Sequence, residues 1–181
     1  GNGQFGTVSC GGPSGTGMAA GDVNGDGKLD LVVADVLPGQ VRIHLGDGAG
    51  CVGAATSIDV QNAGRPRFVA LTDLNKDGKL DIVAGATVLL NNGSGAFGSP
   101  FAFGMGSLGA DPGANTVVAD FDGDSNLDIA SASRGTAGIL FGNGAGGFRF
   151  AVGPAERGVF GFAHADLNND GKLDIVGMSA G

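Results

Sequence analysis

The sequence predicts an all-β protein built from repeated units, and three observations carry this prediction. Glycine accounts for 38 of the 181 residues while hydrophobic residues still make up 42%, a combination typical of many short strands joined by glycine turns. A nine-residue acidic pattern recurs four times, each time before a short apolar run. A glycine-rich turn alternates with this pattern, and no segment has helical periodicity of useful length.

The acidic pattern keeps one registry in all four copies. It reads DVNGDGKLD at 22–30, DLNKDGKLD at 73–81, DFDGDSNLD at 120–128 and DLNNDGKLD at 166–174. The apolar runs LVVAD, IVAGA, IASAS and IVGMS follow the four copies in order. The glycine turns read GNGQF from Gly1, GDGAGCV from Gly46, NNGSGAF from Asn91 and GNGAGGF from Gly142.

Each period therefore predicts four short strands. The first enters the acidic loop (18–21, 68–72, 116–119 and 162–165), and the second leaves it. The third ends at the glycine turn, and the fourth begins at Phe5, Val52, Phe97 or Phe148. A four-stranded unit of about 45 residues has the size of a β-propeller blade, and blades stack to cover both their faces. We expect one domain, residues 1–181, that is a single array of about four such blades.

The acidic loop has the donor set of a calcium site. Positions 1, 3, 5 and 9 carry carboxylates and amides, and the carboxylates repel one another unless a cation with 6–8 oxygen ligands lies between them. Position 6 is a glycine in three of the loops and permits a sharp turn. Position 7 offers its backbone carbonyl, so that Lys28 can turn its ammonium outward. We predict about four calcium ions, one per loop, held by Asp22, Asn24, Asp26, Lys28, Asp30, Asp73, Asn75, Asp77, Lys79, Asp81, Asp120, Asp122, Asp124, Asn126, Asp128, Asp166, Asn168, Asp170, Lys172 and Asp174.

Charge supports a metal and limits its identity. Thirteen of the 18 carboxylates lie in these loops, and four divalent ions would bring the net charge of −8 to about zero. No loop has the Glu at position 12 that an EF-hand needs, and zinc lacks His and Cys ligands here. Magnesium is disfavoured because it resists dehydration. The third loop departs from the others with Asp122 and with Ser125 in place of glycine. We expect strain at Ser125 if position 6 needs a positive φ.

Catalysis is not expected. We predict that His44 faces outward on a strand with Arg42 and that His164 lies on an inner strand near Asp166. Neither has a nucleophile or acid at a recognisable spacing. Arg65 and Arg67 are candidates for an anionic ligand or a solvated loop, and the net acidity argues against nucleic acid. No apolar run approaches the roughly 20 residues of a membrane span.

Two further features leave alternatives open. Cys10 and Cys51 form either a disulfide, as in a secreted chain, or two buried thiols. The chain has no Trp or Tyr, which weakens a lectin function without excluding it. Phe5, Phe97 and Phe148 occupy equivalent positions that we expect in the core.

The pattern D-x-[DN]-x-D-G-x-x-D before a β run resembles the FG-GAP/VCBS repeats of the integrin α-subunit propeller and of related propellers. This resemblance implies an extracellular, calcium-binding propeller module for binding or adhesion that is not an enzyme, with calcium in the loop between the first two strands of a blade. A lectin-like accessory domain of a secreted enzyme is an alternative. With four loops and an incomplete final unit, a second alternative is a structural subunit that assembles head to tail, or is completed by further repeats.

Overall fold

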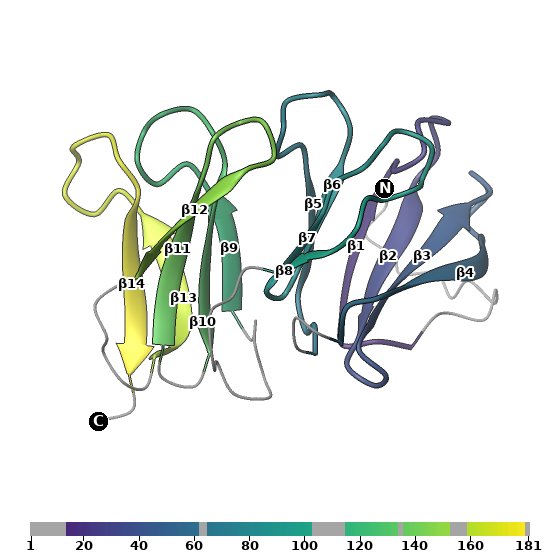
Figure 1. Ribbon diagram of the computed structural model, residues 1–181, viewed down its shortest axis with the longest axis horizontal. Coiled ribbons are helices and arrows are strands. Elements are labelled where there is room, and N and C mark those ends of the chain that lie inside the picture. Colours follow the sequence, from purple (N-terminus) through teal and green to yellow (C-terminus); the bar gives the residue numbers. More distant parts are fainter. Residues whose placement is uncertain (1–13, 62–64, 103–114, 134–135, 153–158, 180–181) are drawn as a thin grey trace, which may run out of the picture.

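The computed structural model describes residues 14–61, 65–102, 115–133, 136–152 and 159–179. Their strands form antiparallel sheets that follow one another along the chain (Figure 1). The strands are β1 (Gly17–Gly21), β2 (Asp30–Asp35), β3 (Gln40–Gly46), β4 (Val52–Asp59), β5 (Val69–Thr72), β6 (Asp81–Ala84), β7 (Thr87–Leu89), β8 (Phe101–Ala102), β9 (Asn115–Ala119), β10 (Asp128–Ser133), β11 (Thr136–Gly142), β12 (Phe148–Val152), β13 (Val159–Ala165) and β14 (Asp174–Ser179).

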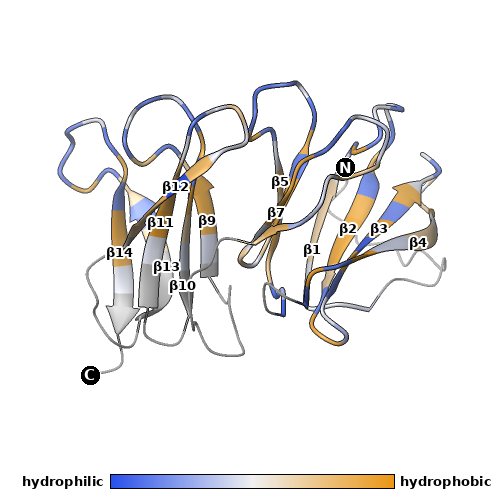
Figure 2. Cartoon of the chain, viewed as in Figure 1, coloured by the Kyte–Doolittle hydropathy of each residue, from blue (hydrophilic) through white to orange (hydrophobic). Residues whose placement is uncertain are grey.

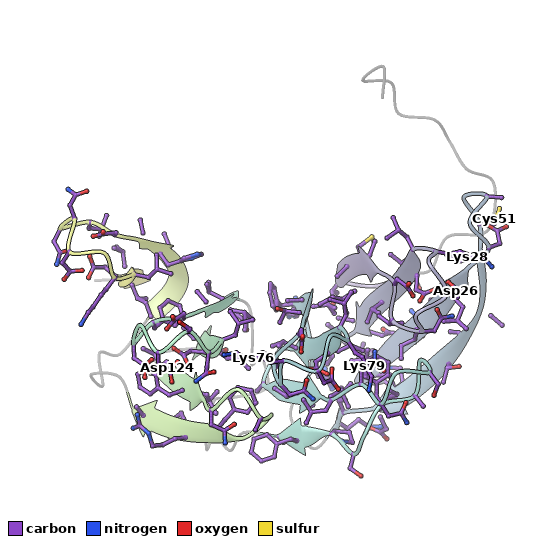
Figure 3. All side chains as sticks on the ribbon, turned by 90° about the horizontal axis from the view of Figure 1, so that it is seen from above. Asp26, Lys28, Cys51, Lys76, Lys79 and Asp124 are labelled. Atoms are coloured by element: carbon purple, nitrogen blue, oxygen red, sulfur yellow. The ribbon has the colours of Figure 1, made fainter. Side chains whose placement is uncertain are left out.

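Each sheet is one blade with its strands in chain order, and three of the sheets have four strands. The first three blades are β1–β4, β5–β8 and β9–β12, and β13 pairs with β14 in the fourth. Viewed from above, the blades follow an arc (Figure 3). The first strands of neighbouring blades meet, with β1 against β5 and β9 against β13. The predicted all-β fold of propeller blades is confirmed.

The strand boundaries follow the repeat, with one exception. β4 and β12 begin at Val52 and Phe148 as predicted. In the second blade, Phe97 forms only an isolated bridge with Asn91, and β8 begins at Phe101. The prediction that the fourth strand of this blade begins at Phe97 is therefore wrong. Phe5 lies outside the described residues.

The hydrophobic core lies between blades. Hydrophobic residues concentrate on the strands, and the acidic loops are hydrophilic (Figure 2). One cluster joins the first blade to the second and includes Val32, Ile43 and Ile82. A second cluster joins the second blade to the third and includes Val83 and Ile129. Neighbouring residues of one strand therefore serve two different interfaces, because successive side chains of a strand point to opposite faces.

The aromatic residues at the glycine turns take part in these interfaces. Phe97 packs against the first cluster and Phe148 against the second, each half-buried. The core role expected of these two residues is confirmed. The described segments contain no helix with the length and hydrophobicity that crossing a bilayer requires.

Candidate metal centre

The acidic loops connect the first and second strands of each blade and gather along one edge of the arc (Figure 1). In each loop the aspartate at position 1 accepts backbone hydrogen bonds from later loop residues. Asp22 takes the amides of Gly25 and Gly27, both at 2.7 Å. Asp120 takes those of Gly123 at 2.7 Å and Ser125 at 2.8 Å. The second and fourth loops repeat the bond to position 6.

The backbone of the loop turns through the left-handed region twice. At position 6, Gly27 has a φ of 80° and Ser125 a φ of 67°. The strain predicted for a residue with a side chain at this position is therefore present in the third loop. Position 4 is also left-handed, and there the chain uses Lys76 (φ 61°) and Asn169 (φ 59°) as well as glycine. The sequence pattern did not reveal this second turn, because position 4 has no constant residue type.

Positions 3 and 5 hold the middle of the loop. The side-chain oxygen of Asn24 accepts the amide of Asp26 at 3.0 Å, and Asp26 accepts that of Lys28 at 2.9 Å. These bonds recur in the second and fourth loops. Each of these bonds spans two residues, and together they hold the segment that carries positions 1, 3 and 5 in the same conformation in these loops.

The third loop shows the resulting cluster directly. Carboxylate oxygens of Asp120, Asp122 and Asp124 lie within 4.8 Å of one another. Oxygens that share a calcium ion at 2.3–2.6 Å can be no farther apart than about 5 Å, so this donor set fits one ion. Among the described residues, this is the one group of three or more His, Cys, Asp or Glu side chains with such spacing. The first, second and fourth loops carry an amide at position 3 instead.

At position 7 the side chain turns back to the loop. The Lys28 ammonium lies 3.6 Å from a carboxylate oxygen of Asp26, and that of Lys79 lies 3.3 Å from Asp77. We expected these ammonium groups to point away from the loop, and the structure places them beside the position 5 carboxylate. In the third loop the amide of Asn126 donates to Asp124 at 2.8 Å.

In the first three loops the aspartate at position 9 is buried and clamps the loop to the blade. Asp81 accepts the amide of Leu74 at 2.9 Å and that of Asn91 at 2.8 Å. Asp30 and Asp128 make the same two bonds, to position 2 of their own loop and to the residue that ends the third strand. Sequence reasoning assigned these residues to the metal alone, because the second bond depends on the register of strands that the motif does not contain.

Burial and hydrogen bonding shift the acidity of these carboxyls in opposite directions. Desolvation raises the pKa of Asp81 and of Asp128, although the backbone amides they accept lower it. At position 1, the amide of Gly27 is the main cause that lowers the pKa of Asp22. At position 5, the amide of Asn126 is the main cause that lowers the pKa of Asp124. The exposed part of the loop is therefore built to hold negative charge.

The first two loops also interact with the following blade. Asn91 is buried, and its amide donates to the carbonyl of Val23 in the first loop at 2.8 Å and to that of Leu80 at 3.0 Å. Lys76 of the second loop contributes to lowering the pKa of Asp124 in the third, and both lie near the middle of the arc (Figure 3). The repeat does not predict the bond from Asn91 to the first loop, because the other glycine turns begin with glycine at this position.

The two histidines lie on different blades. His44 is buried, and its Nδ1 lies 2.9 Å from the carbonyl oxygen of Gly53. The prediction that it faces outward is wrong, since strand alternation gives the face but not what covers it. Leu45, on the other face, is exposed. His164 lies exposed on β13 with its ring edge-to-face with Phe121, the centroids 6.3 Å apart.

The cysteines and the two arginines before β5 are the remaining residues that the sequence singled out. Cys51 is disulfide-bonded, and Cys10 lies outside the described residues. Arg65 and Arg67 are exposed on the segment before β5.

Comparison of the fold with solved structures finds β-rich proteins. A lectin from Agrocybe aegerita, described as recognising non-reducing terminal N-acetylglucosamine, matches with a TM-score of 0.57 and 21% identity over 89% of this chain and 46% of its own. The V. cholerae biofilm matrix protein Bap1 matches with a TM-score of 0.53 and 22% identity over 89% of this chain and 23% of its own.

BBS1N, solved in complex with ARL6DN, matches with a TM-score of 0.54 and 13% identity over 92% of this chain and 55% of its own. The chain thus spans about half or less of the length of these three structures. A sequence comparison with curated proteins found no significant match. The model of the FG-GAP-like repeat matches residues 22–84 and 120–177, two segments that each begin at an acidic loop. The chain therefore belongs to the FG-GAP-like repeat family.

Proposed function

We propose that the chain is a non-catalytic, calcium-binding propeller module that serves binding or adhesion outside the cell. The observation that supports a metal site is the cluster of Asp120, Asp122 and Asp124, whose carboxylate oxygens lie within 4.8 Å of one another. The same backbone hydrogen bonds shape the other three loops. Calcium would supply positive charge to carboxylates that otherwise repel one another.

The residues that would hold each ion are those at positions 1, 3 and 5, with the position 7 carbonyl. The position 9 aspartate lies beside them, but both its oxygens already accept backbone amides in the first three loops, where it is buried. Calcium and the ammonium of Lys28 or Lys79 would act on the same position 5 carboxylate. Binding is therefore accompanied by release of this side chain from the loop.

An extracellular location is consistent with two properties. Extracellular calcium modules bind at roughly 10⁻⁴–10⁻³ M, a range suited to exposed loops with one or two neutral ligands. Cys51 is disulfide-bonded, and disulfides persist in oxidising compartments. Bap1, which has a similar fold, is a biofilm matrix protein.

Thermal melts in calcium, in magnesium and in EDTA test the metal. Calcium is expected to raise the midpoint, because an ion that binds only the folded state stabilises it by mass action. Asp122→Asn gives the third loop the amide found in the others and is expected to weaken one site of about four in calorimetry. Equal midpoints in calcium and EDTA would contradict calcium binding.

Carbohydrate binding is the second candidate. A hollow of about 600 Å³ beside the third loop is lined by Asp122, Asn126, Phe141, Asn143 and Arg149 among others. The guanidinium of Arg149 lies over the Phe141 ring, 4.9 Å from its centroid. Aromatic and polar groups that converge on a hollow are typical of small-ligand sites. Binding on a glycan array that Arg149→Ala abolishes would favour this function over protein adhesion.

A further inference from the structure

The glycine turn of the second blade, residues 91–97, lies between the first two acidic loops, and one side chain holds it to both. Asn91 is buried, and its amide donates one hydrogen to the carbonyl of Val23, at position 2 of the first loop, at 2.8 Å. The other hydrogen goes to the carbonyl of Leu80, at position 8 of the second loop, at 3.0 Å. The amide oxygen of Asn91 accepts the backbone amide of Gly93 at 2.8 Å. Both donors and the oxygen are therefore used, which fixes the orientation of the side chain.

The glycines of this turn approach both loops closely. A β-carbon at Gly95 would lie 3.3 Å from the β-carbon of Asn24, at position 3 of the first loop. A β-carbon at Gly93 would lie 2.6 Å from the Cε atom of Lys79, at position 7 of the second loop. The ammonium of Lys79 also donates to the carbonyl of Asn92 in the turn at 3.3 Å. The turn is therefore in contact with residues of both candidate metal sites.

Asn91 replaces a glycine that stands at its position in the first and third blades. These glycines are Gly46 and Gly142, and a side chain at either would collide with the carbonyl oxygen at loop position 8, that of Leu29 or Leu127. In the second blade the turn leaves room for a side chain, and Asn91 bonds to this carbonyl instead. At this position of the turns that the structure describes, Asn91 alone has a side chain that reaches the preceding loop.

The bridge fixes the first loop between two of its candidate ligands. The backbone amide of Val23 donates to the carboxylate of Asp30 at 3.0 Å, and its carbonyl accepts the amide of Asn91 at 2.8 Å. Both backbone groups of this residue are therefore held. Val23 lies between Asp22 and Asn24, at ligand positions 1 and 3. Asn91 thus acts from the next blade on the backbone that carries these two side chains.

The second loop in turn sets the position of Asn91. The backbone amide of Asn91 donates to the buried carboxylate of Asp81, at position 9, at 2.8 Å. Leu80, which accepts its side-chain amide, directly follows Lys79, whose carbonyl would bind the ion. Because positions 8 and 9 follow a candidate ligand along the backbone, ordering of the second loop fixes both partners of Asn91.

We propose that Asn91 couples the first two acidic loops, so that calcium bound in either loop raises the affinity of the other. The inference rests on the proposed calcium binding and adds a regulation of these sites. A loop whose position 2 is already held loses less conformational freedom when it binds an ion, and this loss is part of the cost of binding. Linkage requires the two affinities to change by the same factor.

Two single-site variants measure the coupling. Asp26→Asn disables the first loop and Asp77→Asn disables the second, each at the exposed position 5. Residue-resolved NMR titration with calcium follows the backbone amides of Gly27 and Gly78, which report on the two loops through their bonds to position 1. Asp77→Asn is expected to raise the Kd of the first loop at least about 5-fold, and Asp26→Asn is expected to raise that of the second loop by the same factor.

Hydrogen exchange shows the same coupling without binding at the first loop. In Asp26→Asn the first loop no longer binds calcium. Calcium in the second loop is nevertheless expected to slow the exchange of the Val23 amide, because Asn91 holds the carbonyl of the same residue.

Asn91→Gly tests whether this side chain carries the coupling. The substitution copies the residue of the other two turns, keeps the backbone amide that Asp81 accepts and changes no charge, so the repulsion between two bound ions is unaltered. In this background, disabling one loop is expected not to raise the Kd of the other. Ser94→Ala, in the same turn, copies Ala49 and Ala145 and is the matched control that is expected to keep the full coupling. Thermal melts in EDTA confirm that each variant is folded.

The outcomes distinguish a failure of the coupling from a failure of calcium binding. Calcium binding in both loops with a Kd that rises in neither single-site variant would overturn the coupling and leave the metal sites standing. Coupling that persists in Asn91→Gly would overturn the role of Asn91. No calcium binding in the unsubstituted chain would overturn the metal sites and the inference together. If Asn91→Gly does not fold, the two single-site variants still decide whether the loops are coupled.

Discussion

Replacing Asp81 by asparagine tests whether this carboxylate holds the loop to the blade or binds the metal. The Asp81 carboxylate is buried and accepts the amides of Leu74 and Asn91 at 2.9 and 2.8 Å. Hydrogen bonds to a charged group contribute about 1.5–3 kcal/mol each, and an asparagine keeps one neutral bond of about 1 kcal/mol. Burial disfavours the charged form of Asp81 and raises its pKa. Because asparagine is neutral, the substitution removes this cost of burying a charge, which offsets part of the loss. We expect a net cost of about 2–3 kcal/mol.

This cost is expected with or without calcium, because the two bonds lie within the protein. For a chain of this size, 1 kcal/mol moves the melting midpoint by about 2–4 °C, so Asp81→Asn lowers it by roughly 5–10 °C in EDTA. Asp77→Asn, at exposed position 5, is the matched control and is expected to lose calcium stabilisation with little change in EDTA. If Asp81→Asn melts like the unsubstituted chain in EDTA and differs only in calcium, the clamp is wrong.

Two further predictions concern the glycine turns. Asp47 accepts the backbone amides of Ala49 and Cys51, and these bonds lower its pKa. The ionised carboxylate therefore stabilises the fold at pH values above its ordinary pKa of 3.8. This stabilisation is lost as the pH falls through the lowered pKa. Asp47→Asn, which copies Asn143 of the third blade, should remove this dependence, and melting curves at pH 2.5 to 6 measure it. Asn91→Ala leaves the carbonyls of Val23 and Leu80 without their donor and should cost about 2–4 kcal/mol in denaturant unfolding; a cost below 1 kcal/mol would refute the bridge between blades.

Much of this fold is predictable from the sequence because the repeat is local. The loop positions, the strands beside them and the pairing of neighbouring strands all lie within one period, so nine residues in fixed registry suffice to place them. Strand alternation also correctly put Arg42 and His44 on one face. Alternation did not predict that His44 is buried, because the residues that cover this face come from outside the strand pair.

The features that escaped prediction depend on the neighbouring blade or on hairpin register. Asp81 reaches the amide of Asn91 only because β6 and β7 pair in the observed register. The bond from Asn91 to Val23 spans 68 positions of the chain, and no local pattern encodes it. Ser125 is the reverse case, since one departure from glycine was enough to predict a strained position that the structure confirms.

The acidic loop and the interface between blades form one unit rather than two. Position 2 of each loop lies between ligand positions 1 and 3, and in the first two loops its side chain is buried against the next blade. Its backbone amide is held by the position 9 aspartate. An ion that orders positions 1, 3 and 5 therefore also fixes the side chain that docks the following blade. Calcium is consequently expected to stabilise the contacts between blades more than the sheet within any one blade, and hydrogen exchange in calcium and EDTA would show the larger change at the interfaces.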